Sequence, residues 1–228
     1  MLCGPRRIER EPATLGAGRH LLGHRARRPL ISNLTGMPRL FSPAVPEGTL
    51  RGTAQPTIPA GELALRPWRA ADAPEVRAAF DNPEIRHWHR RRFDSVAEAG
   101  EWIAGWSAQW AAETAASWAI TGGALAGQVG LRNIDLASGC ASLSYWVLPA
   151  ARGRKVATRA VRALAEWCFG ELGLRRLEIP HSAANEASCR VAGGLGYPLE
   201  GIMEGALPHE DGWHDMHLHA RVTVPAST

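Results

Sequence analysis

The sequence predicts a mixed α/β domain with about four helices and an antiparallel meander of strands. Three observations support this prediction. Apolar residues recur at helical spacing in four segments, short strand-like runs lie between them, and Gly or Pro residues separate most of these runs. The 228-residue chain is 45% hydrophobic and 21% charged, a composition typical of a globular protein that can bury a core.

The first 60 residues differ in composition from the rest. They contain nine Arg, no Lys and three Glu, a net charge of +6, whereas the whole chain carries +4, so residues 61–228 carry −2. Gly, Pro, Arg and Ser dominate this segment, and no helical or strand period persists in it. We therefore expect residues 1–60 to be a disordered or poorly ordered basic extension, and residues 61–228 to form the domain.

The first half of the domain contains one strand, two helices and an antiparallel meander. Alternating apolar residues predict a strand at Leu63–Pro67. Asp72 and Ser95 each precede a Glu by three residues, a pattern typical of helix starts, and apolar residues follow both at helical spacing. The first helix is expected to end at Asn82-Pro83. Turn dipeptides then separate three predicted strands, at residues 117–121, 126–134 and 141–148.

The second half begins with the most strongly amphipathic helix of the chain. From Ala157 to Cys168, apolar residues recur at helical spacing, and charged residues fall on the other face. The helix is expected to end near Gly170. The remaining predicted elements are a strand at Leu177–Ile179, a helix at Asn185–Leu195, and strands at Leu199–Met203 and Met216–Val222.

The loop before the amphipathic helix is rich in Arg and Gly, and residues 152–157 run Arg-Gly-Arg-Lys-Val-Ala. The first turn of a helix has unpaired N–H groups, and the helix dipole adds about half a positive charge there. A diphosphate is the natural ligand of such a terminus. The side chains of Arg152, Arg154 and Lys155 add positive charge. The loop thus predicts an anion site, with a solvated basic loop as the alternative interpretation.

This loop resembles the acetyl-CoA loop of the GNAT acetyltransferases, Arg/Gln-x-x-Gly-x-Gly/Ala, which Arg152 and Ala157 match at its ends. Residues 185–192, Asn-Glu-Ala-Ser-Cys-Arg-Val-Ala, with Leu-Gly-Tyr at 195–197, resemble a second motif typical of the RimJ/RimL-like branch, the acetyltransferases of ribosomal-protein N-termini. The resemblance implies the GNAT fold: a twisted, mostly antiparallel sheet of about seven strands, splayed between the fourth and fifth strands and flanked by about four helices.

The resemblance also implies an activity and a set of site residues. The enzyme would transfer an acetyl group from acetyl-CoA to a primary amine, either a protein N-terminal α-amine or a small-molecule amine, by direct attack on the thioester. The Val147 N–H would polarise the thioester carbonyl. Asn185 would bind the cofactor arm or an ordered water, and Ser188 would lie near the sulfur and could protonate the leaving thiolate. The implied cofactor-binding residues are Val147, Arg152, Gly153, Arg154, Lys155, Val156, Ala157, Thr158 and Asn185.

The attacking amine must lose a proton, so a base is needed, and His181 is the first candidate. It follows the predicted strand Leu177–Ile179 and should lie near the cleft, and a neutral imidazole suits a base at physiological pH. A structural histidine is the alternative interpretation. His87 and His89, between the two early helices, are the other candidates.

Two positions depart from the family pattern. Lys155 stands where the family has Gly, which lets the backbone approach the phosphates. Ser142 stands where relatives often carry an acidic residue facing the acceptor. These departures support the alternative hypothesis of a catalytically impaired acyl-CoA-binding module.

Several classes of site and partner are not expected. His217 and His219 share one strand face, but no third ligand is evident, so we expect no metal. The four cysteines lie far apart, which favours a reducing, cytoplasmic location. No apolar run is long enough to cross a membrane, and no nucleic-acid-binding motif accompanies the basic extension. Both a monomer and a homodimer are compatible with the sequence.

Overall fold

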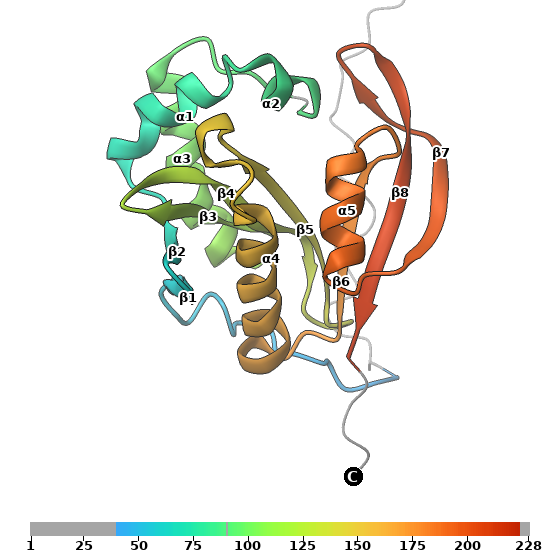
Figure 1. The fold of residues 1–228 in the computed structure, drawn as a ribbon. Helices are drawn as coiled ribbons and strands as arrows, with labels where there is room; N and C mark the ends of the chain where they lie inside the picture. Colours follow the sequence, from blue (N-terminus) through green and yellow to red (C-terminus); the bar gives the residue numbers. More distant parts are fainter. Residues whose placement is uncertain (1–39, 90, 224–228) are drawn as a thin grey trace, which may run out of the picture. The chain divides into compact units, whose positions relative to one another are not determined.

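The computed structural model describes residues 40–89 and 91–223. These residues form one eight-stranded sheet and five α-helices (Figure 1). In order across the sheet, the strands are β1 (Ile58–Ala60), β2 (Leu63–Pro67), β3 (Ala116–Gly122), β4 (Ala124–Asp135), β5 (Cys140–Val147), β6 (Arg176–Ser182), β8 (Gly212–Val222) and β7 (Leu199–His209). The helices are α1 (Ala73–Ala79), α2 (Pro83–His87), α3 (Val96–Ala111), α4 (Val156–Trp167) and α5 (Glu186–Gly194).

The sheet is splayed between β5 and β6. These two strands run parallel and pair only at their first residues, from Cys140 opposite Arg176 to Ser142 opposite Glu178. The other strand pairs of the described chain are antiparallel. Because β5 continues to Val147 without a partner on this side, a gap opens at its carboxyl end (Figure 1). This arrangement confirms the predicted fold and the predicted splay. The sheet has eight strands where seven were expected, and the additional strand is β1.

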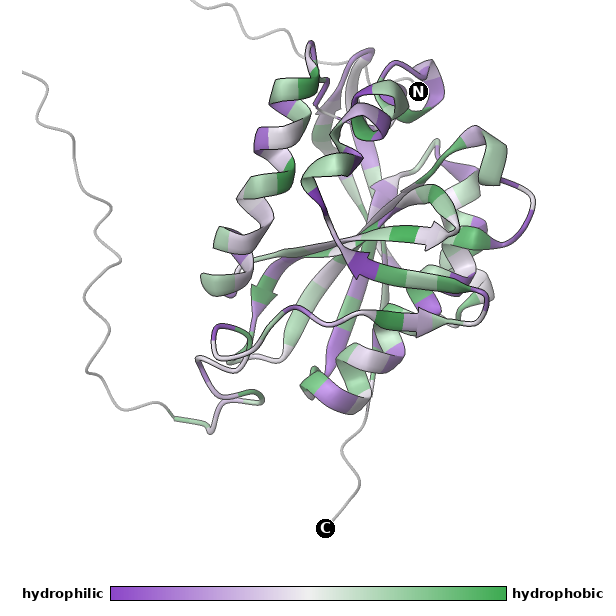
Figure 2. Ribbon diagram, turned by 90° about the vertical axis from the view of Figure 1, so that its left-hand side faces the viewer, coloured by the Kyte–Doolittle hydropathy of each residue, from purple (hydrophilic) through white to green (hydrophobic). Residues whose placement is uncertain are grey.

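Alternation along the strands divides the core into two parts, one on each face of the sheet. Trp118 and Ile120 pack in the cluster that includes α4, whereas Ala119 packs in the cluster of α1 and α3. Neighbouring residues of a strand point to opposite faces, so the two clusters lie on opposite sides. Figure 2 shows hydrophobic residues both on the strands and on the helices that cover them.

The helix boundaries follow from capping residues. Ser95 Oγ accepts a hydrogen bond from the Glu98 N–H at 3.1 Å, which confirms the predicted start of α3. The prediction that Asn82-Pro83 only ends a helix was incomplete. Asn82 Oδ1 also accepts hydrogen bonds from the N–H groups of Glu84 and Ile85, both at 3.1 Å, and thereby starts α2.

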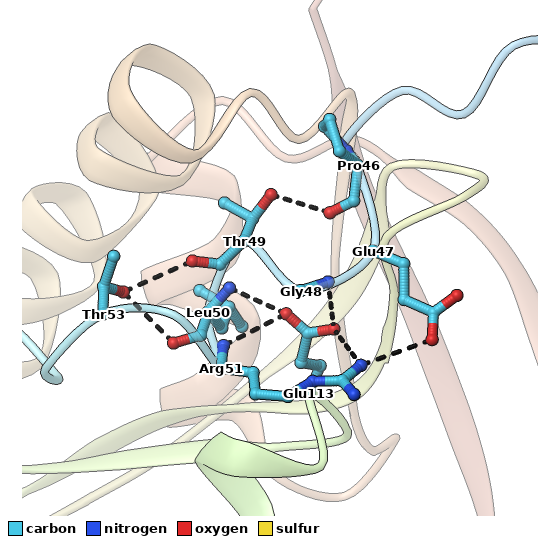
Figure 3. A network of polar contacts seen from close by, with 8 residues as sticks. All are labelled: Pro46, Glu47, Gly48, Thr49, Leu50, Arg51, Thr53 and Glu113. Carbon is cyan, nitrogen blue, oxygen red and sulfur yellow. Dashed lines mark hydrogen bonds and ion pairs between the residues drawn. The ribbon is translucent and has the colours of Figure 1, made fainter.

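Ordered structure begins before residue 61, so the expected boundary of the basic extension was wrong for residues 41–60. The carboxylate of Glu113, which follows α3, accepts hydrogen bonds from the N–H groups of Gly48, Leu50 and Arg51 at 2.7, 2.7 and 3.2 Å (Figure 3). Leu50 is 2% exposed and packs in the α4 cluster. The remainder of the expected extension, residues 1–39, lies outside the described residues.

The last two strands form a hairpin longer than predicted. The expected strand from Leu199 to Met203 continues to His209, across a register shift between Met203 and Leu207. Gly205 lies in this shift with φ of 51°, and its N–H donates to Asp215 Oδ1 at 2.7 Å. This register shift interrupts the alternation of side chains along β7. The sequence therefore predicted only the part of the strand that precedes the shift. Among the described residues, no helix is both long and apolar enough to cross a membrane.

Candidate active site

A cleft of about 890 Å³ opens where β5 and β6 diverge. Its volume lies in the range of small-molecule and cofactor sites. Four parts of the chain form its walls: α2 with the residues after it, the end of β5, the loop into α4, and the first turns of α5. The lining residues are Pro83, Glu84, Ile85, His87, Trp88, His89, Tyr145, Trp146, Val147, Arg152, Gly153, Lys155, Val156, Ala157, Thr158, Asn185, Ala187, Ser188, Arg190 and Val191.

The start of α4 presents backbone donors to this cleft. Lys155 is the N-cap residue, and no side chain caps the helix. The first turn, Val156 to Thr158, lines the cleft and contains no acidic residue. Because the first N–H groups of a helix have no intrahelical acceptor, this turn offers donors and a positive dipole end to an anion.

The end of β5 presents a second set of backbone donors. The Leu148 N–H donates to the Ala126 carbonyl at 2.9 Å, and Val147 lies opposite Gly127. In an antiparallel ladder this pattern makes Gly127 and Val147 a non-hydrogen-bonded pair. The Val147 N–H therefore points away from β4, toward the gap that β6 has left. The same alternation directs the N–H of Tyr145, two residues earlier, to the same side.

The loop before α4 brings one of its two arginines to the cleft. Arg152 lines the cleft and forms an ion pair with Glu84 of α2, and its Nε lies 3.4 Å from the Val147 carbonyl oxygen. Arg154 instead lines a different cavity, beside Glu62 and Arg159. The expectation that both side chains would face one anion site was therefore wrong for Arg154.

The backbone conformation at Lys155 explains why glycine is favourable at this position. Its φ and ψ are 55° and 29°, in the left-handed region. Gly153, two residues earlier, has φ of 76°. A residue with a Cβ atom pays about 1–2 kcal/mol in this region, whereas glycine does not. Lys155 nevertheless adopts this left-handed conformation, and it lines the cleft.

Asn185 and Ser188 stand together at the start of α5, and both line the cleft. Asn185 Oδ1 accepts a hydrogen bond from the Ser188 N–H at 3.0 Å and so caps the helix. Because Asn185 Oδ1 caps the helix, the side-chain NH₂ group of Asn185 is the part that can contact a cofactor.

Tyr145 is a cleft residue that the sequence analysis did not single out. Its hydroxyl is buried and lies close to the side chain of Ser188. Burial raises the pKa of Tyr145 to about 12, and the nearby Ser188 side chain acts in the opposite direction. The alternation along β5 is the only sequence signal that could have placed this side chain on the cleft face.

The three candidate bases occupy different environments. His87 and His89 line the cleft. Burial lowers the pKa of His89 to about 4, with Arg132 and His209 contributing. His87 Nε2 lies 3.9 Å from a carboxylate oxygen of Asp211.

His181, the first candidate base, was expected near the cleft, but it is not among the residues that line it. It is 6% exposed and packs against His217 and His219. Burial is the main cause that lowers the pKa of His181, and the neighbouring His217 and His219 lower this pKa further. His181 lies instead beside Cys189 of α5 and opposite His217 of β8.

Comparison with known proteins agrees with this geometry. Residues 62–198 match the family model described as acetyltransferase (GNAT) domain. The putative ribosomal N-acetyltransferase YdaF of Bacillus subtilis is 32% identical over 94 residues, which are 41% of this chain. The matched region spans about half, 51%, of the length of YdaF.

Solved structures share the fold. RimJ of Mycobacterium smegmatis, in complex with CoA-disulfide, is 26% identical with a TM-score of 0.68, over 82% of this chain and 93% of RimJ. The RimL ribosomal L7/L12 α-N-protein acetyltransferase, in complex with coenzyme A, is 21% identical with a TM-score of 0.69, over 73% of this chain and 98% of RimL. The family model covers more than half of the chain, and its residues include the cleft-lining segments from Pro83 to Val191. The chain therefore belongs to the GNAT acetyltransferase family, and residues 62–198 match the acetyltransferase domain of that family.

Proposed function

We propose that the protein transfers the acetyl group of acetyl-CoA to the α-amine of a protein N-terminus. The observation that carries the proposal is that two sets of backbone N–H groups, at the start of α4 and at the end of β5, line one cleft. The first set suits a diphosphate. The second suits an extended chain of amides that ends in a thioester, and pantetheine is such a chain.

In this proposal, the Val147 N–H stabilises the negative charge that develops on the thioester oxygen. The amine nitrogen forms a bond to the carbonyl carbon, the carbon–sulfur bond breaks, and the thiolate leaves. Ser188 donates a proton to that thiolate. Tyr145, whose pKa of about 12 keeps it protonated at neutral pH, lies near enough to Ser188 to replace the donated proton.

The proton lost by the amine passes to a cleft histidine. His89 is neutral at physiological pH, but its pKa of about 4 makes it a weak acceptor. His87 is the preferred candidate, because it lines the cleft and the Asp211 carboxylate, 3.9 Å from its Nε2, can hold the ring in place. His181, which lies outside the cleft, has no part in the proposed transfer.

The nature of the acceptor rests on the relatives. YdaF is named as a putative ribosomal N-acetyltransferase, and RimL as an α-N-protein acetyltransferase of ribosomal L7/L12. Both names refer to the ribosome, and the name of RimL specifies the α-amine of a protein. A cytoplasmic location belongs to the same proposal, because ribosomal proteins are made there.

A peptide panel tests the proposal. Acetyl-CoA and the protein are incubated with peptides that have a free N-terminus, and free thiol release is measured together with the peptide mass. We expect stoichiometric thiol release and addition of one acetyl group at the α-amine. Two control peptides carry a blocked N-terminus, one with and one without an internal Lys. Acetylation of the internal Lys alone, or of small-molecule amines alone, would contradict the proposed acceptor.

A further inference from the structure

Four side chains with metal-ligand chemistry meet between α5 and the strands β6 and β8. They are His181 of β6, Cys189 of α5, and His217 and His219 of β8. One potential ligand atom from each residue lies within 4.8 Å of the other three. Strand pairing creates the cluster, because His181 lies opposite His217 and His219 follows on the same face.

The hydrogen bonds of two histidines define which nitrogens face the cluster. Nδ1 of His181 lies 2.7 Å from the Ser182 carbonyl oxygen, and Nδ1 of His219 lies 2.9 Å from the Tyr197 carbonyl oxygen. A carbonyl oxygen only accepts, so both Nδ1 atoms carry a proton. Each Nε2 atom therefore offers a lone pair. His219 Nε2 directs it at Cys189 Sγ, 3.7 Å away.

Two of these imidazoles have buried nitrogens without a hydrogen-bond partner among the described residues. They are Nε2 of His181 and Nδ1 of His217. His181 is only 6% exposed, so its bare nitrogen is well shielded from solvent. Leaving a buried acceptor unpaired is costly, and such groups in folded proteins call for an explanation. A metal ion would satisfy these lone pairs and the thiol together.

We propose that His181, Cys189, His217 and His219 bind a Zn²⁺ ion. A set of one Cys and three His matches the tetrahedral nitrogen and sulfur coordination that Zn²⁺ prefers. Metal-bound histidines commonly donate their other ring N–H to a backbone carbonyl, as His181 and His219 do. Ideal coordination requires ligand atoms roughly 3.3–3.6 Å apart, so the most distant pair of ligand atoms would move closer by up to about 1.5 Å. On binding, the Cys189 thiol releases its proton to solvent.

The site would tie α5 to the sheet. Cys189 directly follows Ser188, which lines the cleft, so the ion would hold the cleft-lining turn of α5 against β6 and β8. The sequence expectation of no metal rested on the lack of a third ligand near His217 and His219. That premise was wrong, because the fold brings His181 and Cys189 to them.

Cobalt spectroscopy tests the site. The full-length protein, without a histidine tag, is titrated with Co²⁺, which reports thiolate ligation as a near-ultraviolet charge-transfer band and tetrahedral geometry as intense visible bands. We expect both signals to saturate at one equivalent and Zn²⁺ to abolish them by displacement. Cys189→Ser should remove the charge-transfer band and weaken Co²⁺ binding by roughly 100-fold or more.

Matched cysteine variants serve as controls. Cys140→Ser, in a half-buried residue of β5, and Cys3→Ser should keep both signals. His217→Gln leaves the thiol intact and should weaken binding while changing the visible bands, which tests the site even if Cys189→Ser folds poorly. The proposal would be overturned by a wild-type protein that shows only the spectrum of hydrated Co²⁺. A charge-transfer band that persists in Cys189→Ser, or that is lost in Cys140→Ser, would overturn it equally.

Discussion

Lys155 combines backbone strain with a charge at the mouth of the cleft. Its φ of 55° is unfavourable for a residue with a Cβ atom. We therefore expect Lys155→Gly to raise the free energy of unfolding by about 1 kcal/mol, since removal of the strain exceeds the entropy that glycine adds to the unfolded chain.

Lys155→Ala is the matched variant, because it removes the same charge but keeps the Cβ atom. Its free energy of unfolding should stay within about 0.5 kcal/mol of the wild type. Urea denaturation of the three proteins measures the differences. Equal stability of the Gly and Ala variants would show that the left-handed conformation is not the source of strain.

Comparing variants of Arg152 and Arg154 tests whether acetyl-CoA binding depends on a specific arginine contact or only on the positive charge of the loop. Arg152 lines the cleft, whereas Arg154 lies in a different cavity. A charge-assisted contact contributes about 1.5–3 kcal/mol, so we expect Arg152→Ala to weaken acetyl-CoA binding by about tenfold or more. Arg154→Ala should change the affinity less than about twofold. Isothermal titration calorimetry at one salt concentration makes the comparison, and equal losses in both variants would exclude a specific contact from Arg152.

At the scale of elements, the segment at residues 46–53 depends on one carboxylate. Burial alone would raise the pKa of Glu113, but hydrogen bonds from Gly48, Arg51 and Leu50 outweigh it and lower the pKa. We expect Glu113→Gln to reduce the free energy of unfolding by about 1–3 kcal/mol, because a neutral amide binds these N–H groups less strongly. Glu47→Gln, at an exposed carboxylate of the same network, should change it by less than about 0.5 kcal/mol.

The same carboxylate predicts a pH dependence. A folded-state pKa below the unfolded value of about 4.3 means that Glu113 stabilises the fold above that pH. This stabilisation is lost as the pH falls through the folded-state pKa. The stability difference between the wild type and Glu113→Gln should therefore be constant near neutral pH and shrink below about pH 4. Chemical denaturation across this range measures it; a difference that grows on acidification would contradict the assigned role.

The sequence predicted elements where local signals agreed, and missed those that depend on distant contacts. Ser95 with Glu98 and the apolar residues after them indicated α3 correctly. The segment at residues 41–60 has no period of its own, because it is held by the carboxylate of Glu113, more than 60 residues away. Composition alone therefore assigned it to a disordered extension.

At the scale of the whole molecule, the sequence predicted the order of the helices and strands, but it did not predict which residues of different elements contact one another. Two motifs implied the splay between β5 and β6, and the structure contains it. The surroundings of His181 depend on the register between β6 and β8, which no local pattern reveals. The packing of α5 on β8 likewise brings Cys189 Sγ within 3.7 Å of His219 Nε2, 30 residues further along the chain.

The central claim is that backbone N–H groups of α4 and β5 bind acetyl-CoA in one cleft, and amide NMR tests it most directly. Titration of the labelled protein with acetyl-CoA should shift the amide signals of Val147, Val156, Ala157 and Thr158 most, with saturation at one equivalent. Saturating shifts confined to residues outside the cleft, such as those around Arg154 and Glu62, would contradict the account.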